Sequence, residues 1–313
     1  MLKTRKLRLK RLLFKLIVLL IIFSFLFILF EISSRAIIGK RLIAQVEPNG
    51  LYHFKPNQEG WYVHIISSPK ARINNIGARG QDIDINLLNS TKKYIFLGDS
   101  FTFGWVLKDN ETIPEYFKEN LNLSSESVLN YGNGGYGIDH MIAAYEYNKN
   151  YFGKGDTIIT ILINADFYRP MSPYESSIKK ELFWKIKEKS SFISWMWATS
   201  QHLLGVINEE DAMDINKSKD IFKEEGQKLI SFNNILKKDK INLIYVFYEY
   251  NQTDYSLKAK EFCKENNLVC ITNVYNDISL IKNVPIYTYD QKHPSNYSNK
   301  AVAEKIARFI NKE

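Results

Sequence analysis

The chain has 313 residues, of which 45% are hydrophobic and 24% are charged, a balance typical of a globular protein with a sizeable core and not of a disordered one. The formal net charge is +8, but residues 1–15 carry seven basic side chains and no acidic one, so the other 35 basic and 34 acidic residues leave +1 for the rest. A nucleic-acid binder needs its basic excess on a folded surface, where it displaces cations from phosphates. The charge pattern therefore argues against a nucleic-acid partner.

A hydrophobic segment follows the basic tail. Fifteen uncharged residues run from Leu16 to Phe30, and the residues from Leu12 lengthen the segment to about 19, or about 28 Å of helix. A cleaved signal peptide has a shorter apolar centre and a small-residue cleavage site, and a buried core helix does not follow seven cations, so both alternatives are weaker. We expect a cytoplasmic tail (1–11), a transmembrane signal anchor (12–31) and a single-pass protein of the cell membrane, with the remainder extracytoplasmic.

Beyond the anchor, the pattern changes twice. Residues 32–88 predict a connecting region with short strands, of which 61–66 is one, separated by Gly- and Asn-containing turns. From residue 89 to 313, uninterrupted apolar runs alternate with helical patterns, which predicts one doubly wound α/β domain with a parallel sheet. The expected strands are 94–97, 127–129, 157–163, 241–247 and 268–272, and the expected helices are 112–121, 138–149, 219–237, 255–266 and 297–311.

One stretch, about 167–218, interrupts this alternation and is rich in aromatic residues. It is either a helical insert that acts as a lid or faces the membrane, or an excursion whose aromatic side chains pack on the sheet. Both alternatives stay open, with the second favoured, because buried aromatic side chains are the commoner case.

The two cysteines, Cys263 and Cys270, lie at a predicted turn from a helix to a strand. An extracytoplasmic domain permits a disulfide there, and two buried thiols are an equal alternative. The sequence has neither a C-x-x-C nor an H-E-x-x-H spacing, so we expect no metal site.

A serine directly follows the first predicted strand of the domain, in Gly98-Asp99-Ser100. This placement exposes a hydroxyl at the carboxyl end of a parallel strand, where ligands of such sheets bind, and turns the backbone N–H toward the same site. A helix N-cap is the alternative role, because Asp and Ser are preferred there. A catalytic role for Ser100 also requires a base.

A histidine that meets this requirement lies just before the last predicted helix. His293 follows Asp290 by three residues, so one loop can present an imidazole and a carboxylate that orients it and stabilises its cation. Taken alone, the segment also fits a turn with a surface histidine. Together with Ser100, it favours a nucleophile, a base and an orienting acid.

Two further segments can supply hydrogen-bond donors for a negatively charged oxygen. The stretch 130–137, Asn-Tyr-Gly-Asn-Gly-Gly-Tyr-Gly, follows the second strand, and its glycines let a backbone N–H approach a ligand. Because no Rossmann fingerprint follows, dinucleotide binding is not expected. Asn164 follows the third strand and offers a side-chain amide, although an asparagine that only forms a turn is an alternative.

As a set, these four segments resemble the SGNH hydrolases, also called GDSL esterases or lipases, over about residues 72–313. The resemblance implies a flavodoxin-like three-layer α/β/α fold. It implies Ser100 as the nucleophile, and the Ser100 and Gly135 N–H groups with the Asn164 amide as the oxyanion hole. It further implies the acid–base pair Asp290 and His293. The segment 73–80 resembles the one that precedes the nucleophile in membrane-linked members.

The third block departs from the family pattern, because Ala165 follows Asn164 where the family has an Asp directly after its Asn. Either Asn164 is the donor, or a shift of register leaves no asparagine there. The resemblance implies ester hydrolysis or O-acyl transfer through an acyl-enzyme, without a cofactor, on an acetylated or otherwise acylated envelope glycan or on a lipid ester. The alternative function is a catalytically silent scaffold that binds glycan or another envelope protein.

Overall fold

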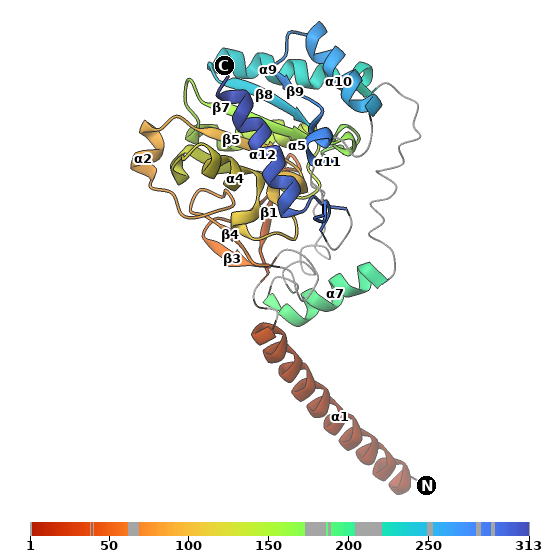
Figure 1. The fold of residues 1–313 in the computed structure, drawn as a ribbon. Helices are drawn as coiled ribbons and strands as arrows, with labels where there is room; N and C mark the ends of the chain where they lie inside the picture. The colour runs from red at the N-terminus through yellow and green to blue at the C-terminus, as the bar shows by residue number, and fades with distance from the viewer. Residues whose placement is uncertain are drawn as a thin grey trace. The chain divides into compact units, whose positions relative to one another are not determined.

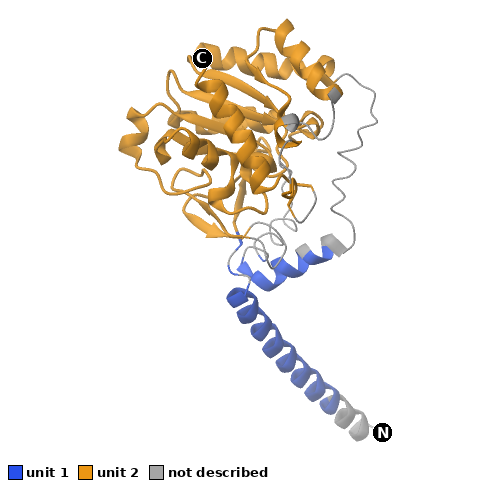
Figure 2. Cartoon of the chain, in the orientation of Figure 1, with its two compact units in different colours: residues 1–41, 64–66, 176–206 blue, residues 42–63, 67–175, 207–313 orange. Residues whose placement is uncertain are grey.

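The structure is a computed structural model that describes residues 2–37, 39, 41–61, 69–172, 186, 189–203, 221–248, 253–279, 283–288 and 292–312. It consists of two compact units (Figure 2). Unit 1 comprises residues 1–41, 64–66 and 176–206, and unit 2 comprises residues 42–63, 67–175 and 207–313.

Among its described residues, unit 1 contains the helices α1 (Leu2–Ile37) and α7 (Ser191–Leu203). Within α1, the 28 residues from Lys10 to Ile37 are long and apolar enough to cross a membrane, and none of their most apolar stretch is buried. This helix is compatible with the expected single-pass anchor. The side of the membrane on which unit 2 lies stays a prediction.

Unit 2 is built on a parallel sheet in the order β6-β5-β7-β8-β9 (Figure 1). The strands are β5 (Tyr94–Gly98), β6 (Val128–Asn130), β7 (Thr157–Leu162), β8 (Asn242–Phe247) and β9 (Cys270–Ile271). Numbered along the chain, the order is 2-1-3-4-5, the arrangement of flavodoxin-like doubly wound sheets. The predicted fold class is confirmed, because each crossover places a helix on one face of the sheet.

Side chains alternate between the two faces and build two cores. Ile95 and Leu97 of β5 pack in one core, and Phe96 packs in the other. The first core includes α5 (Ile138–Asn148), α9 (Gly226–Asp239) and α10 (Thr253–Glu265), and the second includes α4 (Ile113–Asn120), α11 (Val274–Ser279) and α12 (Asn296–Ile310). Helices therefore cover both faces, as the uninterrupted apolar strands predict.

The observed bounds differ little from the expected ones, with one informative exception. The helix expected over 219–237 is divided into α8 (Ile221–Glu224) and α9, which begins at Gly226. A Cβ atom at Gly226 would lie 2.6 Å from the Phe262 ring, so this glycine allows close packing of α9 on α10. At the end of α10, Cys263 and Cys270 form a disulfide, which settles that alternative in favour of the bond.

In the described part of the chain before the sheet, two pairs of strands are antiparallel. β1 (Ala44–Val46) pairs with β2 (Tyr52–Phe54), and β3 (Gln58–Gly60) pairs with β4 (Ala71–Ile73). Of the strand expected over 61–66, only Trp61 belongs to the described residues. The remaining short elements are α2 (Ile85–Ser90), α3 (Ser100–Phe103), η1 (Asp109–Glu111), η2 (Ser125–Ser127), η3 (Lys149–Tyr151) and η4 (Asn164–Phe167). Within 167–218, the helix α7 is described, and most of the remainder lies outside the described residues.

Candidate active site

The turn from β5 into α3 places Ser100 at the carboxyl end of the sheet. Asp99 is the N-cap of α3, and its carboxylate oxygen Oδ1 accepts a hydrogen bond from the Phe101 N–H at 2.9 Å. Ser100 is therefore the first residue of the helix rather than its cap. Its hydroxyl is not needed to close the helix end, and its N–H belongs to the first turn, where backbone donors are left without helical partners.

His293 lies directly against this serine, although 193 residues separate the two in the chain. Its Nε2 atom is 2.9 Å from Ser100 Oγ, within hydrogen-bond distance. The imidazole is buried and packs beside the rings of Trp105, at 5.8 Å, and Phe101, at 5.6 Å. The predicted nucleophile and base are thus brought together.

The loop before α12 holds the histidine in this place. The Thr288 N–H donates to the His293 carbonyl oxygen at 2.9 Å, and Ser295 caps α12 by accepting a hydrogen bond from the Ser298 N–H. Asp290, the expected orienting acid, lies outside the described residues, so its role stays a prediction.

Two further histidines, His53 and His140, have different surroundings. The Nε2 atom of His53 is 2.9 Å from a Glu47 carboxylate oxygen. The Nδ1 atom of His140 accepts a hydrogen bond from the Gly137 N–H, and burial lowers the pKa of His140. The first contact supports the hairpin of β1 and β2, and the second supports the glycine-rich loop, so both histidines have a structural role.

The glycine-rich loop after β6 packs on the nucleophile turn. Asn133 donates its N–H to the Gly98 carbonyl oxygen at 3.0 Å, and a Cβ atom at Gly132 would lie only 2.4 Å from the Phe103 nitrogen. Gly135, the expected oxyanion residue, has φ of +78°, which favours glycine. Among the described residues, the Gly135 N–H has no hydrogen-bond acceptor, so this donor is available to a ligand.

Asn164 is the first residue of η4, immediately beyond β7. Its side chain is half-buried and makes no hydrogen bond to any described part of the chain, whereas Ala165 is buried in the core and Asp166 is fully enclosed. Of these three residues, Asn164 alone carries an amide at this end of β7. This placement favours Asn164 as the donor, and its role stays a prediction.

A buried ionic cluster lies under the same loops. The Nη1 atom of Arg169 donates to Asp99 Oδ2 at 3.0 Å, to Asp166 Oδ1 at 2.8 Å and to the Tyr136 carbonyl oxygen at 3.3 Å. One guanidinium thus joins the nucleophile turn, the glycine-rich loop and η4. Burial, together with the negative charge of Asp99, raises the pKa of Asp166 well above its usual value, although Arg169 opposes this effect.

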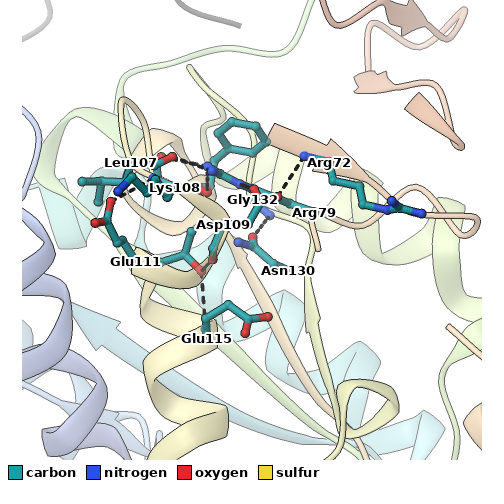
Figure 3. A network of polar contacts seen from close by, with 12 residues as sticks. Arg72, Arg79, Leu107, Lys108, Asp109, Glu111, Glu115, Asn130 and Gly132 are labelled. Atoms are coloured by element: carbon teal, nitrogen blue, oxygen red, sulfur yellow. Dashed lines mark hydrogen bonds and ion pairs between the residues drawn. The ribbon is translucent and has the colours of Figure 1, made fainter. Parts of the chain in front are cut away.

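A second arginine supports the far end of α3. Figure 3 shows Arg79 at the centre of a polar network. Its guanidinium donates to the carbonyl oxygens of Phe103, Gly104 and Leu107 at 2.6–2.8 Å and to Asp109 Oδ1 at 2.8 Å. The segment 73–80 therefore stabilises the turn that follows the nucleophile.

Neither arginine is identified by the sequence analysis. Arg79 and Arg169 act through partners that are distant in the chain, and no local spacing identifies them. The nearest signal for Arg169 is an arginine just beyond the Asn164 segment, and for Arg79 it is the family-like segment that contains it.

A cavity of about 670 Å³ lies beside the histidine loop. Its lining combines apolar and polar side chains from the segment after α3 and from the loop before α12, namely Val106, Leu107, Pro285, Ile286, Tyr287, Thr288, Ser295 and Asn296. Small ligands bind in concave sites with this mixture of surfaces. Thr288 and Ser295, which lie on either side of His293 in the chain, line the cavity, whereas Ser100, Gly135, Asn164 and His293 are not among its lining residues.

No protein-family profile matches the sequence, and no curated protein matches it. Solved structures with a similar fold share little sequence. A member of the lipolytic G-D-S-L family from Veillonella parvula aligns with a TM-score of 0.45 and 13% identity over 71% of this chain and 100% of its own. A catalytic mutant of an acetylxylan esterase from Geobacillus stearothermophilus aligns with a TM-score of 0.43 and 17% identity over 71% of this chain and 95% of its own. A GDSL-like lipase from Bacteroides thetaiotaomicron aligns with a TM-score of 0.40 and 15% identity over 71% of this chain and 88% of its own.

Proposed function

We propose that the chain is a membrane-anchored serine esterase or O-acyltransferase of the SGNH type. The observation that carries this proposal is the 2.9 Å separation of Ser100 Oγ and His293 Nε2 at the carboxyl edge of the sheet. A serine hydroxyl becomes a useful nucleophile when an imidazole within hydrogen-bond reach accepts its proton. The neighbouring N–H groups and amide add donors for the charge that develops during acyl transfer.

In the first half of the reaction, Ser100 Oγ attacks the carbonyl carbon of an ester while its proton moves to His293 Nε2. The carbonyl oxygen becomes an oxyanion that accepts hydrogen bonds from the Ser100 and Gly135 N–H groups and from the Asn164 amide. The intermediate collapses, the bond to the alcohol breaks, and the alcohol leaves with the proton from His293. Ser100 then carries the acyl group.

In the second half, a hydroxyl group attacks the acyl-enzyme and gives its proton to His293. Collapse of the second intermediate returns this proton to Ser100 Oγ and releases the acylated product. Water as the attacking group makes the protein an esterase, and a sugar hydroxyl makes it a transferase. Asp290 is the residue we expect to orient His293 in both halves. No metal or organic cofactor takes part.

We propose an acetyl or another short acyl ester of an envelope glycan as the substrate. The cavity beside Ser295 and Leu107 offers polar and apolar surfaces together, which suits a sugar ring with a small acyl group. A lipid ester is the second candidate, because the protein is expected to lie at a membrane. A comparison of turnover on short and long acyl esters separates the two.

The test is hydrolysis of p-nitrophenyl acetate by the full-length protein in detergent, with labelling by a serine-reactive fluorophosphonate. We expect Ser100→Ala and His293→Ala to lower kcat by about 10³-fold or more, and Ser100→Ala to abolish labelling. Ser90→Ala, at an exposed serine, is the matched control and should have no effect. Unchanged hydrolysis in Ser100→Ala would contradict the mechanism.

The same experiment tests the other candidate, a silent scaffold that binds glycan or an envelope partner. A folded wild-type protein that neither hydrolyses the ester nor reacts with the probe would support this alternative. Faster release of p-nitrophenol on addition of a glycan, with transfer of the acyl group to it, would identify a transferase.

A further inference from the structure

Helix α7 in unit 1 has a composition unusual for a helix that faces water. Its 13 residues, Ser-Phe-Ile-Ser-Trp-Met-Trp-Ala-Thr-Ser-Gln-His-Leu, contain no lysine, arginine, aspartate or glutamate. At 1.5 Å per residue the helix is about 20 Å long, too short to cross a hydrocarbon core of about 30 Å. Such a segment is suited to a buried core or to the boundary between lipid and water.

The amino end of α7 is bound to the membrane-spanning helix by one carboxylate. Glu31 of α1 accepts hydrogen bonds from the Ser191 N–H at 3.1 Å, from the Phe192 N–H at 3.0 Å and from the Ser190 hydroxyl at 2.7 Å. These N–H groups belong to the first turn of α7 and have no partners within the helix. A negative charge at this end also interacts favourably with the helix dipole.

Aromatic contacts also join the beginning of α7 to the apolar segment of α1. The Phe192 ring stacks on Phe30 with centroids 5.3 Å apart and meets the edge of Phe27 at 5.8 Å. Both partners belong to the apolar segment expected to cross the membrane. Phe192 therefore packs against the end of the segment expected to cross the membrane, next to Glu31, the first charged residue of α1 beyond that segment.

Residues 189–192, before and within the first turn of α7, make ring and polar contacts with α1. Figure 2 shows that the two helices belong to the same unit. A helix that begins at the edge of the hydrocarbon core, cannot cross it and carries no charge is best accommodated in the interface.

One face of α7 is apolar over its first two turns. Phe192, Ile193, Met196 and Trp197 follow the spacing of a single helical face. Met196 is 51% exposed and Trp197 is 40% exposed. Ser194 lies on another side, is buried, and accepts a hydrogen bond from Arg41. The apolar face thus presents large hydrophobic side chains, including a tryptophan of the kind enriched at lipid–water boundaries.

We propose that α7 is an interfacial helix, which inserts the face formed by Phe192, Ile193, Met196 and Trp197 into the phospholipid bilayer at the end of α1 that carries Glu31. The protein then has two contacts with one leaflet, a spanning helix and a helix in the plane of the interface. The occupant of this face is lipid, and neither a protein partner nor a second copy of the chain is required. The proposal is independent of any catalytic activity.

The test measures the depth of α7 in the full-length protein reconstituted in phosphatidylcholine–phosphatidylglycerol vesicles. Cys263 and Cys270 are joined in a disulfide, so a cysteine introduced by Met196→Cys offers a separate thiol for a nitroxide label. We expect the label to be more accessible to oxygen, which partitions into lipid, than to a water-soluble nickel complex. Trp197→Cys, on the same face, should give the same result.

Lys149→Cys is the matched control, because this side chain is exposed on unit 2, and its label should be accessible mainly to the nickel complex. A water-accessible label at both Met196 and Trp197 would overturn the proposal. Labels protected from both reagents, or dipolar broadening between labels, would also overturn it, because these results indicate a protein partner or a second copy. Circular dichroism and intact vesicle insertion confirm that each labelled variant is folded.

Discussion

The amino ends of β5 and β7 differ from the carboxyl ends of the same strands in how buried charges are balanced. At the amino ends, the Lys93 ammonium lies 3.1 Å from Asp156 Oδ2, and both side chains are buried. The ammonium also donates to the carbonyl oxygens of Leu88 and Thr91, and the second carboxylate oxygen of Asp156 accepts the Lys93 N–H. One positive and one negative charge are thus paired and hydrogen-bonded.

At the carboxyl ends, the balance is uneven. Asp99 and Asp166 are both buried and share the single guanidinium of Arg169. Asp99 Oδ2 also lies 3.5 Å from Ser100 Oγ. When both carboxylates are ionised, the cluster therefore holds a net negative charge directly beneath the nucleophile.

The two edges are suited to different roles. At the amino edge, the charges of Lys93 and Asp156 are balanced and hydrogen-bonded, so no further change of charge would stabilise the pair much. The amino edge therefore serves the stability of the fold. A surplus negative charge favours a cation nearby, and we expect it to assist formation of the imidazolium of His293 during the reaction. Perturbed, unevenly balanced charges of this kind are typical of functional sites.

The largest expected effect comes from breaking the balanced pair. Lys93→Met leaves the Asp156 carboxylate buried without its cation, and removal of one partner of a buried pair costs about 3–5 kcal/mol in the free energy of unfolding. Urea unfolding of the detergent-solubilised protein measures this change. The turnover of the folded fraction should stay at the wild-type value, because Lys93 lies at the opposite edge from Ser100.

Lys149→Met is the control for that experiment, because Lys149 forms an exposed pair with Glu146, and exposed pairs contribute little. We expect no measurable change in unfolding. A loss of turnover per folded molecule in Lys93→Met would mean that the two edges are coupled, and the comparison would then be wrong.

The second prediction concerns the oxyanion donor at the carboxyl edge. We expect Asn164→Ala to lower kcat by about 10²–10³-fold, equivalent to about 2.7–4 kcal/mol in the activation barrier, because one donor to the oxyanion is lost. The unfolding midpoint should not change, since the side chain is half-buried and makes no hydrogen bond within the described residues.

Asn164→Asp sharpens this test, because a carboxylate has the same shape but lacks the N–H donor. It should lose activity at least as strongly, whereas Asn86→Ala, at an exposed asparagine, should have no effect. Wild-type turnover in Asn164→Ala would favour the shifted register, in which no asparagine donates at this position.

The third prediction concerns removal of the disulfide, which should have a smaller effect that is confined to stability. Replacing Cys263 and Cys270 together by serine should lower the free energy of unfolding by about 2.5 kcal/mol, the loop-closure value for a ring of about eight residues. The bond connects the end of α10 with the beginning of β9, away from Ser100, so kcat for p-nitrophenyl acetate should not change. Reduction of the wild-type protein should reproduce the loss of stability.

Much of the fold can be predicted from sequence, because its signals are local. Uninterrupted apolar runs identify buried parallel strands, and their alternation with helices leaves few topologies. Ser100 and His293 can be predicted as partners because each lies next to the end of a recognisable element, although 193 residues separate them. Their distance of 2.9 Å could not be derived, since it depends on the packing of two loops.

The residues that the sequence analysis missed make long-range contacts. Arg169 reaches back 70 residues to Asp99, and Lys93 reaches forward 63 residues to Asp156. Charged residues are mostly exposed in proteins, so a single lysine or arginine in a sequence gives no reason to expect burial. Only the fold, which brings the strand ends together, shows which charges must pair.

The smallest expected effect tests the surplus charge itself. Because burial and the charge of Asp99 raise the pKa of Asp166, the folded protein binds a proton at this carboxyl more tightly than the unfolded chain does. Its contribution to stability is therefore complete below the usual carboxyl pKa of 3.8 and declines as the pH rises through the higher folded value. In Asp166→Asn this decline should be absent, so the difference between the two unfolding profiles should grow from pH 4 upward.

Asp82→Asn, at an exposed carboxylate, is the control and should leave the slope of the wild-type profile unchanged. His140 titrates in the opposite sense, since its lowered pKa makes its contribution fall with falling pH, but it is present in all three proteins and cancels in the difference. Parallel profiles for wild type and Asp166→Asn would mean that Arg169 offsets the effects of burial and of Asp99 on the pKa of Asp166, and the expected difference between the two edges would then be wrong.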